Sequence, residues 1–130
     1  MPGRIISPGV ELNSQRFQIV NDRDGRVRLA PVEGPQIEWD SLLSLWQATL
    51  AHEQKVTGMI GKLVDLSLEH GDHSTNNFLQ WFVGEQVEEE ATAKEWLQKL
   101  RLVSDSGAGI YMVDQELATR VFTTPVWLKL

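Results

Sequence analysis

Two long stretches, residues 40–70 and 74–103, carry apolar side chains at helical spacing on either side of Gly71. Each is about 30 residues long, which is typical of long amphipathic helices rather than strands. Gly71 is suited to end the first helix, and Asp40 or Ser41 is suited to begin it. The pattern therefore predicts an all-α fold built on a long antiparallel helical hairpin.

Each predicted helix places a glutamate on its apolar stripe. The first stripe contains Leu43, Trp46, Leu50, Glu53, Thr57, Ile60 and Val64, and the second contains Phe78, Phe82, Gln86, Glu89, Ala93, Trp96 and Leu100. Glu53 lies 18 residues before Gly71 and Glu89 lies 18 residues after it. At a rise of about 1.5 Å per residue, both carboxylates lie roughly 27 Å from the turn. We expect them to meet at one level inside the hairpin.

A buried carboxylate is costly unless it takes up a proton, finds a cation or binds a metal. Neither stripe carries Lys or Arg, so the sequence favours a metal held between helices by Glu53 and Glu89. The alternative is that the stripe assignment is off by one and the acids lie at a solvated edge. Gln86, one turn before Glu89, is either a ligand through its carbonyl, a hydrogen-bond partner of a ligand, or a core amide.

Further acids and histidines surround this pair. Glu85 and Glu88 flank the second stripe and are either an auxiliary metal site or part of a solvated helix face. His52 directly precedes Glu53 in the sequence, but its side chain is expected to point away from the stripe, which indicates a surface residue. His70 and His73 bracket the turn, where turn polarity is favoured over metal binding.

Composition narrows the class of protein. The chain has 130 residues, 42% hydrophobic content, a net charge of −6 and no cysteine. The charge argues against nucleic acid as a partner, and the absence of cysteine excludes disulfides and thiolate-bound metals. No stretch is long and apolar enough to cross a membrane and no secretory signal is visible, so we expect a cytoplasmic protein. No nucleotide loop, nucleophile elbow or zinc signature is present.

The predicted organisation has three parts. Residues 1–36 form an arm rich in Pro and Gly, with β-like pieces at 17–20 and 26–29 that form a small hairpin or a frayed arm. Residues 37–122 hold the helical hairpin, a break at 104–109 and a short helix at about 113–120. Residues 123–130 form a tail.

A two-helix hairpin cannot bury both of its stripes alone, which predicts pairing with a second copy into a four-helix bundle.

Several segments together resemble bacterial non-haem ferritins over about residues 17–122. They are Gly25-Arg26-Val27-Arg28-Leu29, Glu38-Trp39-Asp40-Ser41, Ala51-His52-Glu53-Gln54-Lys55-Val56-Thr57, Asn77-Phe78-Leu79-Gln80-Trp81-Phe82-Val83, Glu85-Gln86-Val87-Glu88-Glu89-Glu90 and Gly109-Ile110-Tyr111-Met112-Val113-Asp114-Gln115-Glu116-Leu117. The resemblance implies the third, fourth and short fifth helices of a ferritin. It departs from the family at the start, where the first helix is missing. The second helix lacks its Glu-x-x-His motif, because that region reads Pro8-Gly9-Val10-Glu11-Leu12.

Ferritins store iron in hollow cages of four-helix bundles and oxidise Fe(II) with oxygen at a di-iron site. By resemblance, Glu53 and Glu89 match iron ligands and Gln86 matches the glutamine beside them. Glu85 and Glu88, with Glu89, match the acids of an additional iron site. The expected cargo is iron (Fe2+/Fe3+), and the expected activity is that of a ferroxidase.

One chain cannot supply the whole family site, so we expect two copies to share Glu53, Glu89 and Gln86; whether a larger assembly forms is left open. Two alternatives stand beside this one. The chain is a non-catalytic subunit that pairs with a full-length ferritin, or it is an inactive remnant that keeps family residues.

Overall fold

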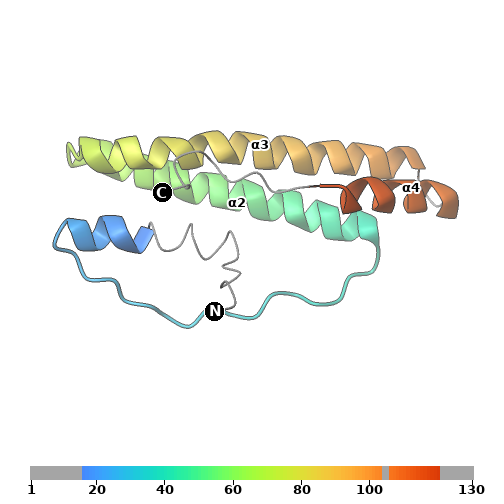
Figure 1. Ribbon diagram of the computed structural model, residues 1–130, viewed down its shortest axis with the longest axis horizontal. Helices are drawn as coiled ribbons and strands as arrows, with labels where there is room; N and C mark the ends of the chain where they lie inside the picture. The colour runs from blue at the N-terminus through green and yellow to red at the C-terminus, as the bar shows by residue number, and fades with distance from the viewer. Residues whose placement is uncertain (1–15, 104–105, 121–130) are drawn as a thin grey trace, which may run out of the picture. The chain divides into compact units, whose positions relative to one another are not determined.

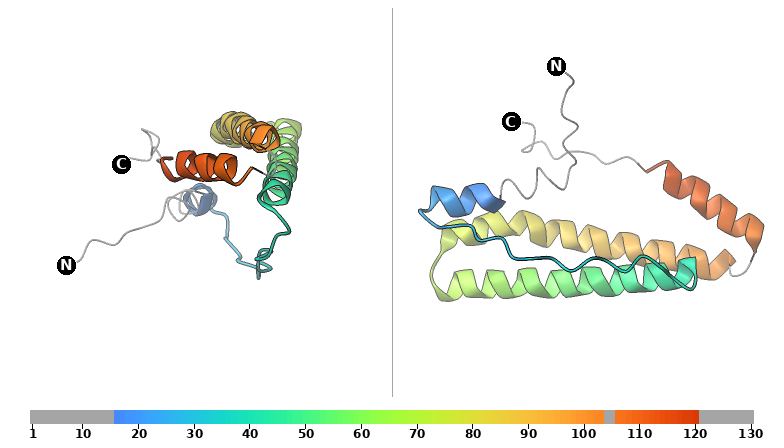
Figure 2. Two further views of the ribbon diagram at one scale, coloured as in Figure 1. Left: turned by 90° about the vertical axis from the view of Figure 1, so that its right-hand side faces the viewer. Right: turned by 90° about the horizontal axis from the view of Figure 1, so that it is seen from below.

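The computed structural model describes residues 16–103 and 106–120, and within them every regular element is helical (Figure 1). The main elements are α2 (Leu42–Glu69), α3 (His73–Val103) and α4 (Gly107–Ala118). Helices α2 and α3 run antiparallel and side by side over most of their length (Figure 2). The prediction of an all-α fold with a long helical hairpin and a short third helix is confirmed.

Both ends of α2 are set by residues that can be recognised in the sequence. The Ser41 hydroxyl accepts from the Ser44 backbone N–H, and the Ser44 hydroxyl lies 3.0 Å from the Ser41 backbone nitrogen, which forms a capping box. Gly71 has φ +62°, a conformation that glycine adopts without steric cost. The N–H groups of Gly71 and Asp72 donate to the carbonyls of Leu68 and Ser67, which completes a Schellman motif.

Asp72 then begins α3. Its carboxylate accepts from the Thr75 backbone N–H at 3.1 Å and from the Thr75 hydroxyl at 2.7 Å. It also places a negative charge at the helix N-terminus, where the helix dipole favours one. The turn therefore needs only His70, Gly71 and Asp72 to reverse the chain, and this short turn aligns the two helices.

Helix α4 closes the end of the hairpin that lies opposite the turn. Its buried Val113 packs with Trp96 and Leu100 of α3, and partly buried apolar side chains complete this cluster: Leu42, Leu43, Trp46, Val103 and Leu117. The Lys99 ammonium lies 2.5 Å from Glu116 of α4 and 2.7 Å from Glu95. The same ammonium lies 4.5 Å from the centre of the Trp96 ring.

The start of α4 differs from the prediction. The sequence predicted a break at 104–109 and a helix from about residue 113, but α4 begins at Gly107. The Ser106 hydroxyl accepts from the Gly109 N–H at 3.2 Å and caps the helix. A Cβ at Gly109 would lie 2.6 Å from the Val103 Cβ, so glycine here allows close packing rather than a break.

Residues 16–35 belong to a different unit from residues 36–119 and are described by themselves. Residues 16–22 are helical, with Gln18 donating to Asp22 across one turn at 2.7 Å. The N–H groups of Asp24 and Gly25 donate to the carbonyls of Asn21 and Val20, which ends this helix in a second Schellman motif with Asp24 at φ 58°. The β-like piece predicted at 17–20 is therefore wrong, because a local cap favours helix there, and residues 26–29 form no strand, in line with the alternative of an irregular arm.

The expectations for residues 1–15 and 121–130 lie outside the described residues.

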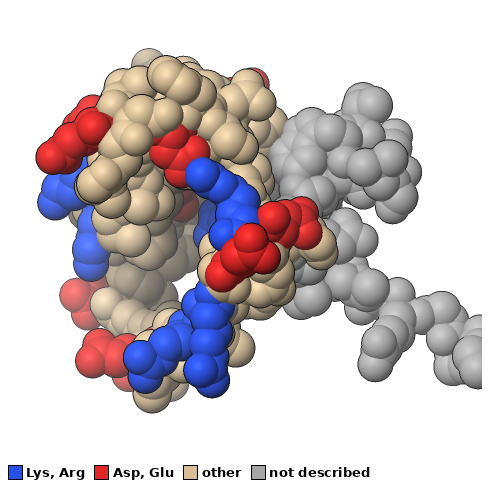
Figure 3. All heavy atoms as spheres, turned by 90° about the vertical axis from the view of Figure 1, so that its left-hand side faces the viewer, with Lys and Arg blue, Asp and Glu red and all other residues tan. Residues whose placement is uncertain are grey.

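Over the described part of the surface seen in Figure 3, acidic and basic side chains are interspersed rather than gathered into one patch of either sign. None of the helices in that part of the chain combines the length and apolar character needed to cross a membrane.

Candidate metal centre

Glu53 and Gln86 face each other across the middle of the α2–α3 hairpin. Gln86 is 8% exposed, and Glu53 is half-buried. The Gln86 side-chain nitrogen donates to Glu53 Oε2 at 3.1 Å and also lies 3.2 Å from the Glu53 backbone carbonyl. The sequence placed both residues in the seam, and the structure brings them into direct contact.

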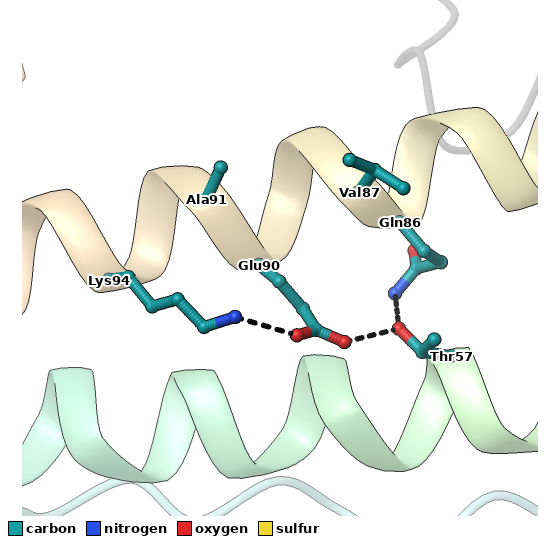
Figure 4. A pocket seen from close by; sticks show the side chains of 6 residues that line it. All are labelled: Thr57, Gln86, Val87, Glu90, Ala91 and Lys94. Atoms are coloured by element: carbon teal, nitrogen blue, oxygen red, sulfur yellow. Dashed lines mark hydrogen bonds and ion pairs between the residues drawn. The ribbon is translucent and has the colours of Figure 1, made fainter.

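A second polar contact crosses the seam at the same level, because Thr57 follows Glu53 by one turn on α2 and Glu90 follows Gln86 by one turn on the antiparallel α3. The Thr57 hydroxyl donates to Glu90 Oε1 at 2.8 Å, and Lys94 Nζ donates to Glu90 Oε2 at 3.1 Å (Figure 4). Hydrogen bonds from Thr57 and then from Lys94 hold the pKa of Glu90 below its ordinary value. These three residues and Gln86 line a shallow groove together with Val87 and Ala91.

The two stripe glutamates do not behave alike within one chain. Glu53 lies in the seam, but Glu89 is exposed, and its neighbour Glu90 is the α3 carboxylate that reaches α2. An apolar stripe advances by three or four residues per turn, so residues 89 and 90 were both compatible with the pattern. The distance of an acid from the turn therefore does not decide which face of the helix it lies on. Glu89 faces solvent at the edge of the hairpin.

Glu85, Glu88 and Glu89 form an acidic group on this edge of α3. Partial burial, followed by the negative charges of Glu88 and Glu89, raises the pKa of Glu85 above its ordinary value. Glu88 and Glu89 follow Glu85 by three and four residues, so each of them is a neighbour of Glu85 on the helix surface. A cation bound near them would relieve their mutual repulsion.

Within residues 16–103 and 106–120, no three His, Asp or Glu side chains converge closely enough to hold a metal ion. His52, His70 and His73 are all exposed. Oxygen atoms that could bind a cation come from Glu53 and Gln86 in the seam and from Glu85, Glu88 and Glu89 at its edge.

Sequence reasoning did not assign the contact between Thr57 and Glu90. One signal for it was available, because Glu90 and Lys94 have the Glu-to-Lys spacing of four residues that stabilises helices and turns both side chains toward the same side. Thr57 gave no comparable signal, since a threonine on an apolar stripe also fits a simple core position.

A long helical hairpin with a carboxylate and an amide in contact at mid-length defines a class of helical-bundle proteins with inward-facing acids. A family model described as ferritin-like domain matches residues 15–103. The chain belongs to the ferritin family. Bacterial non-heme ferritins from Campylobacter jejuni and Escherichia coli O157:H7 are 43% and 42% identical to it, over 74% and 79% of this chain.

Solved structures agree with this assignment. A closed form of the Archaeoglobus fulgidus ferritin, engineered by site-directed mutagenesis, superposes with a TM-score of 0.83 at 43% identity, covering 88% of this chain and 70% of that chain. The open-pore ferritin of the same archaeon also gives 0.83, at 41% identity, covering 86% of this chain and 69% of that chain. The chain spans 58% of the Campylobacter protein and 62% of the Escherichia protein.

Proposed function

We propose that this chain binds iron in the manner of a ferritin, with Glu53 as the central seam ligand. The observation that carries the proposal is the Glu53–Gln86 contact at mid-length of a ferritin-like hairpin. Carboxylate and amide oxygens suit a divalent first-row cation that the protein also releases. Glu85, Glu88 and Glu89 then supply a local negative field that raises the concentration of Fe2+ beside the seam.

The site is completed by a second pair of helices. Apolar side chains at i, i+4 and i+7 of α2, namely Met59, Leu63 and Leu66, are 53%, 51% and 49% exposed. This spacing defines one helix face, and an exposed apolar face of this kind fits a helix partner. We propose that a second copy of the hairpin covers it, so that Glu53, Gln86 and Glu89 of both chains surround a shared carboxylate site.

The proposed activity is oxidation of Fe(II) by oxygen at this shared site. The carboxylates of Glu53 and Glu89 would hold two Fe(II) ions, each of which would lose one electron, and the two electrons together with two protons from water would reduce one O2 to hydrogen peroxide. Carboxylates favour the product because the higher charge of Fe(III) is better balanced by anionic oxygen ligands. Gln86 would keep Glu53 in place while the charge on the iron changes.

The test combines native mass with iron oxidation. The purified chain is titrated anaerobically with Fe(II) and then exposed to air, while the near-ultraviolet absorption of Fe(III)–carboxylate species is followed. The proposal expects a dimer and an absorption increase that is lost in Glu53→Gln and Glu89→Gln. A wild-type chain that gives no absorption change dependent on these two residues would contradict the ferroxidase proposal.

A second function is favoured by the same exposed face of α2. The chain would act as a non-catalytic subunit that pairs with a full-length ferritin, since no metal-binding cluster of three acids or histidines forms within its described residues. Co-purification with a complete ferritin after co-expression would support this role. A stable homodimer that does not exchange with an added full-length ferritin, measured by native mass spectrometry, would count against it.

A further inference from the structure

At mid-seam, one hydrogen bond from α2 and one from within α3 converge on the Glu90 carboxylate of α3. Lys94 Nζ and the Thr57 hydroxyl each donate to one oxygen of Glu90, at 3.1 and 2.8 Å. An ionised carboxylate accepts but cannot donate, so the Thr57 hydroxyl is the donor in its contact with Glu90. Glu90 is 20% exposed and Lys94 is 57% exposed, so the lysine lies at the solvent end of this chain of contacts.

The donor role of the Thr57 hydroxyl contributes to how the Gln86 amide lies. The Thr57 oxygen is 3.3 Å from the Gln86 side-chain nitrogen. The single hydroxyl hydrogen of Thr57 has two acceptors within reach, Glu90 Oε1 and the Glu53 carbonyl at 3.0 Å. Whichever acceptor it takes, the lone pairs of the Thr57 oxygen remain for Gln86. Gln86 therefore presents its NH2 group to α2, where the Glu53 backbone carbonyl, 3.2 Å from the nitrogen, is a further acceptor. Its nitrogen is then able to donate to Glu53 Oε2 at 3.1 Å as well.

We propose that Glu90 and Thr57 are positioning residues for Glu53, acting through the Gln86 amide. Together they hold the NH2 group of Gln86 against one oxygen of the Glu53 carboxylate, which leaves the other oxygen for a divalent cation. This inference rests on the proposed iron-binding role of Glu53. By this inference Glu90 is not a metal ligand, because both of its oxygens already accept hydrogen bonds within the chain.

The contrast between Glu89 and Glu90 supports a positioning role for Glu90 rather than a role as metal ligand. The two acids are adjacent in sequence, yet Glu89 is exposed whereas Glu90 is bound by groups from both helices. Hydrogen-bond partners of a ligand fix its orientation, and their loss typically weakens metal binding by about 10-fold to 100-fold. A simple ion pair between Glu90 and Lys94 would not involve α2, but the contact with Thr57 does.

The test uses the full chain with three variants at the network. Thr57→Val removes the hydroxyl at nearly constant shape, Glu90→Gln allows an amide N–H to point at Thr57, and Thr57→Ser restores the hydroxyl. The first readout is the side-chain amide NMR signal of Gln86 without metal, together with its hydrogen-exchange rate. The second readout is the affinity for Fe(II) under anaerobic conditions. Glu69→Gln, a change of the same kind at an exposed residue of α2, is the matched control.

We expect Thr57→Val and Glu90→Gln to shift the Gln86 amide signal, to speed its exchange and to weaken Fe(II) binding by about tenfold or more. Thr57→Ser and Glu69→Gln should keep both properties close to wild type. Circular dichroism establishes that each variant retains its helices, and a variant that unfolds is replaced by Thr57→Ala.

Two results would overturn the inference. An unchanged Gln86 signal in both network variants would show that the amide does not depend on Glu90 or Thr57. A shifted signal with unchanged Fe(II) affinity would show that the network does not position the ligand. Failure of the wild-type chain to bind Fe(II) would instead refute the proposed function, and the amide signal would still show whether the network orients Gln86.

Discussion

Trp96 combines three kinds of contact in one side chain. It is 4% exposed, its ring centre lies 6.0 Å from that of Trp46, and Lys99 lies over its face. It also belongs to the buried cluster with Leu100 and Val113 that joins α4 to the hairpin. Since one aromatic ring contacts all three helices of this cluster, the attachment of α4 depends strongly on a single residue.

Replacing Trp96 with alanine should therefore destabilise the chain. Truncation of a buried tryptophan typically costs about 3–5 kcal/mol, because the contacts are lost and a cavity remains. The control is Leu102→Ala on the same helix, at a residue that is 79% exposed, where a change within about 0.5 kcal/mol is expected. Chemical denaturation at fixed protein concentration measures both, and equal losses for the two variants would contradict the assigned core.

Glu89 and Glu90 show how far a sequence predicts the position of one side chain. The pattern predicted a carboxylate on α3 at the level of Glu53, because the distance from the turn follows from helix rise. It could not choose between two adjacent acids, since steps of three and four residues both keep to one face. The choice is made by Thr57, a partner 33 residues away that becomes visible only once the helices are packed.

At the scale of elements, the ends of α2 were predictable and the start of α4 was not. Ser41 and Gly71 set helix ends by local hydrogen bonds and backbone conformation, which a sequence records directly. The segment from Ser106 to Gly109 has low helix propensity. It is helical because Ser106 caps it and because Gly109 packs against Val103, and the latter is a tertiary effect.

Two glycine substitutions should have opposite effects. Gly71→Ala forces a side chain into a left-handed conformation and should destabilise the chain by about 1–2 kcal/mol. Gly58→Ala lies inside α2, where an added Cβ meets nothing within 4 Å, and should stabilise it by up to about 1 kcal/mol. Denaturant unfolding measures both changes, and a destabilising Gly58→Ala would indicate a close neighbour at that residue.

The attachment of α4 should weaken at high pH. Hydrogen bonds and charge interactions, first with Glu116 and then with Glu95, raise the pKa of Lys99 above its ordinary value of 10.5. A raised lysine pKa contributes stability that is fully present below 10.5 and is lost as the pH rises through the value in the folded chain. Glu116→Gln should lower the melting temperature at pH 8, and the difference from wild type should shrink above pH 10.5. A difference that stays constant across this range would contradict the role of Lys99.

At the scale of the whole molecule, one apolar face of α2 stays exposed because the described hairpin does not cover it. Its core contains residues such as Leu79, Phe82 and Leu97, yet Met59, Leu63 and Leu66 remain about half exposed. Helical bundles bury such faces by adding helices. The sequence predicts a partner on the ground that neither predicted stripe could be covered by a hairpin alone, and this stays a prediction.

Charge placed on this face should prevent pairing. Leu63→Glu should reduce the dimer fraction, because pairing would then bury an uncompensated carboxylate. The adjacent Lys62→Glu is the control, because Lys62 is an exposed charged residue on a different side of α2. Sedimentation velocity over a range of concentrations measures the effect, and a Leu63→Glu chain that pairs as tightly as wild type would show that this face is not the contact.

The mid-seam contacts also fix how α3 is aligned along α2. Sliding one helix by a single turn would move Gln86 and Glu90 by about 5.4 Å, which would separate them from Glu53 and Thr57. Apolar side chains tolerate such a shift better than amides and carboxylates, which would be left without hydrogen-bond partners. This part of the seam therefore fixes the register of the two helices through hydrogen bonds made within the chain itself.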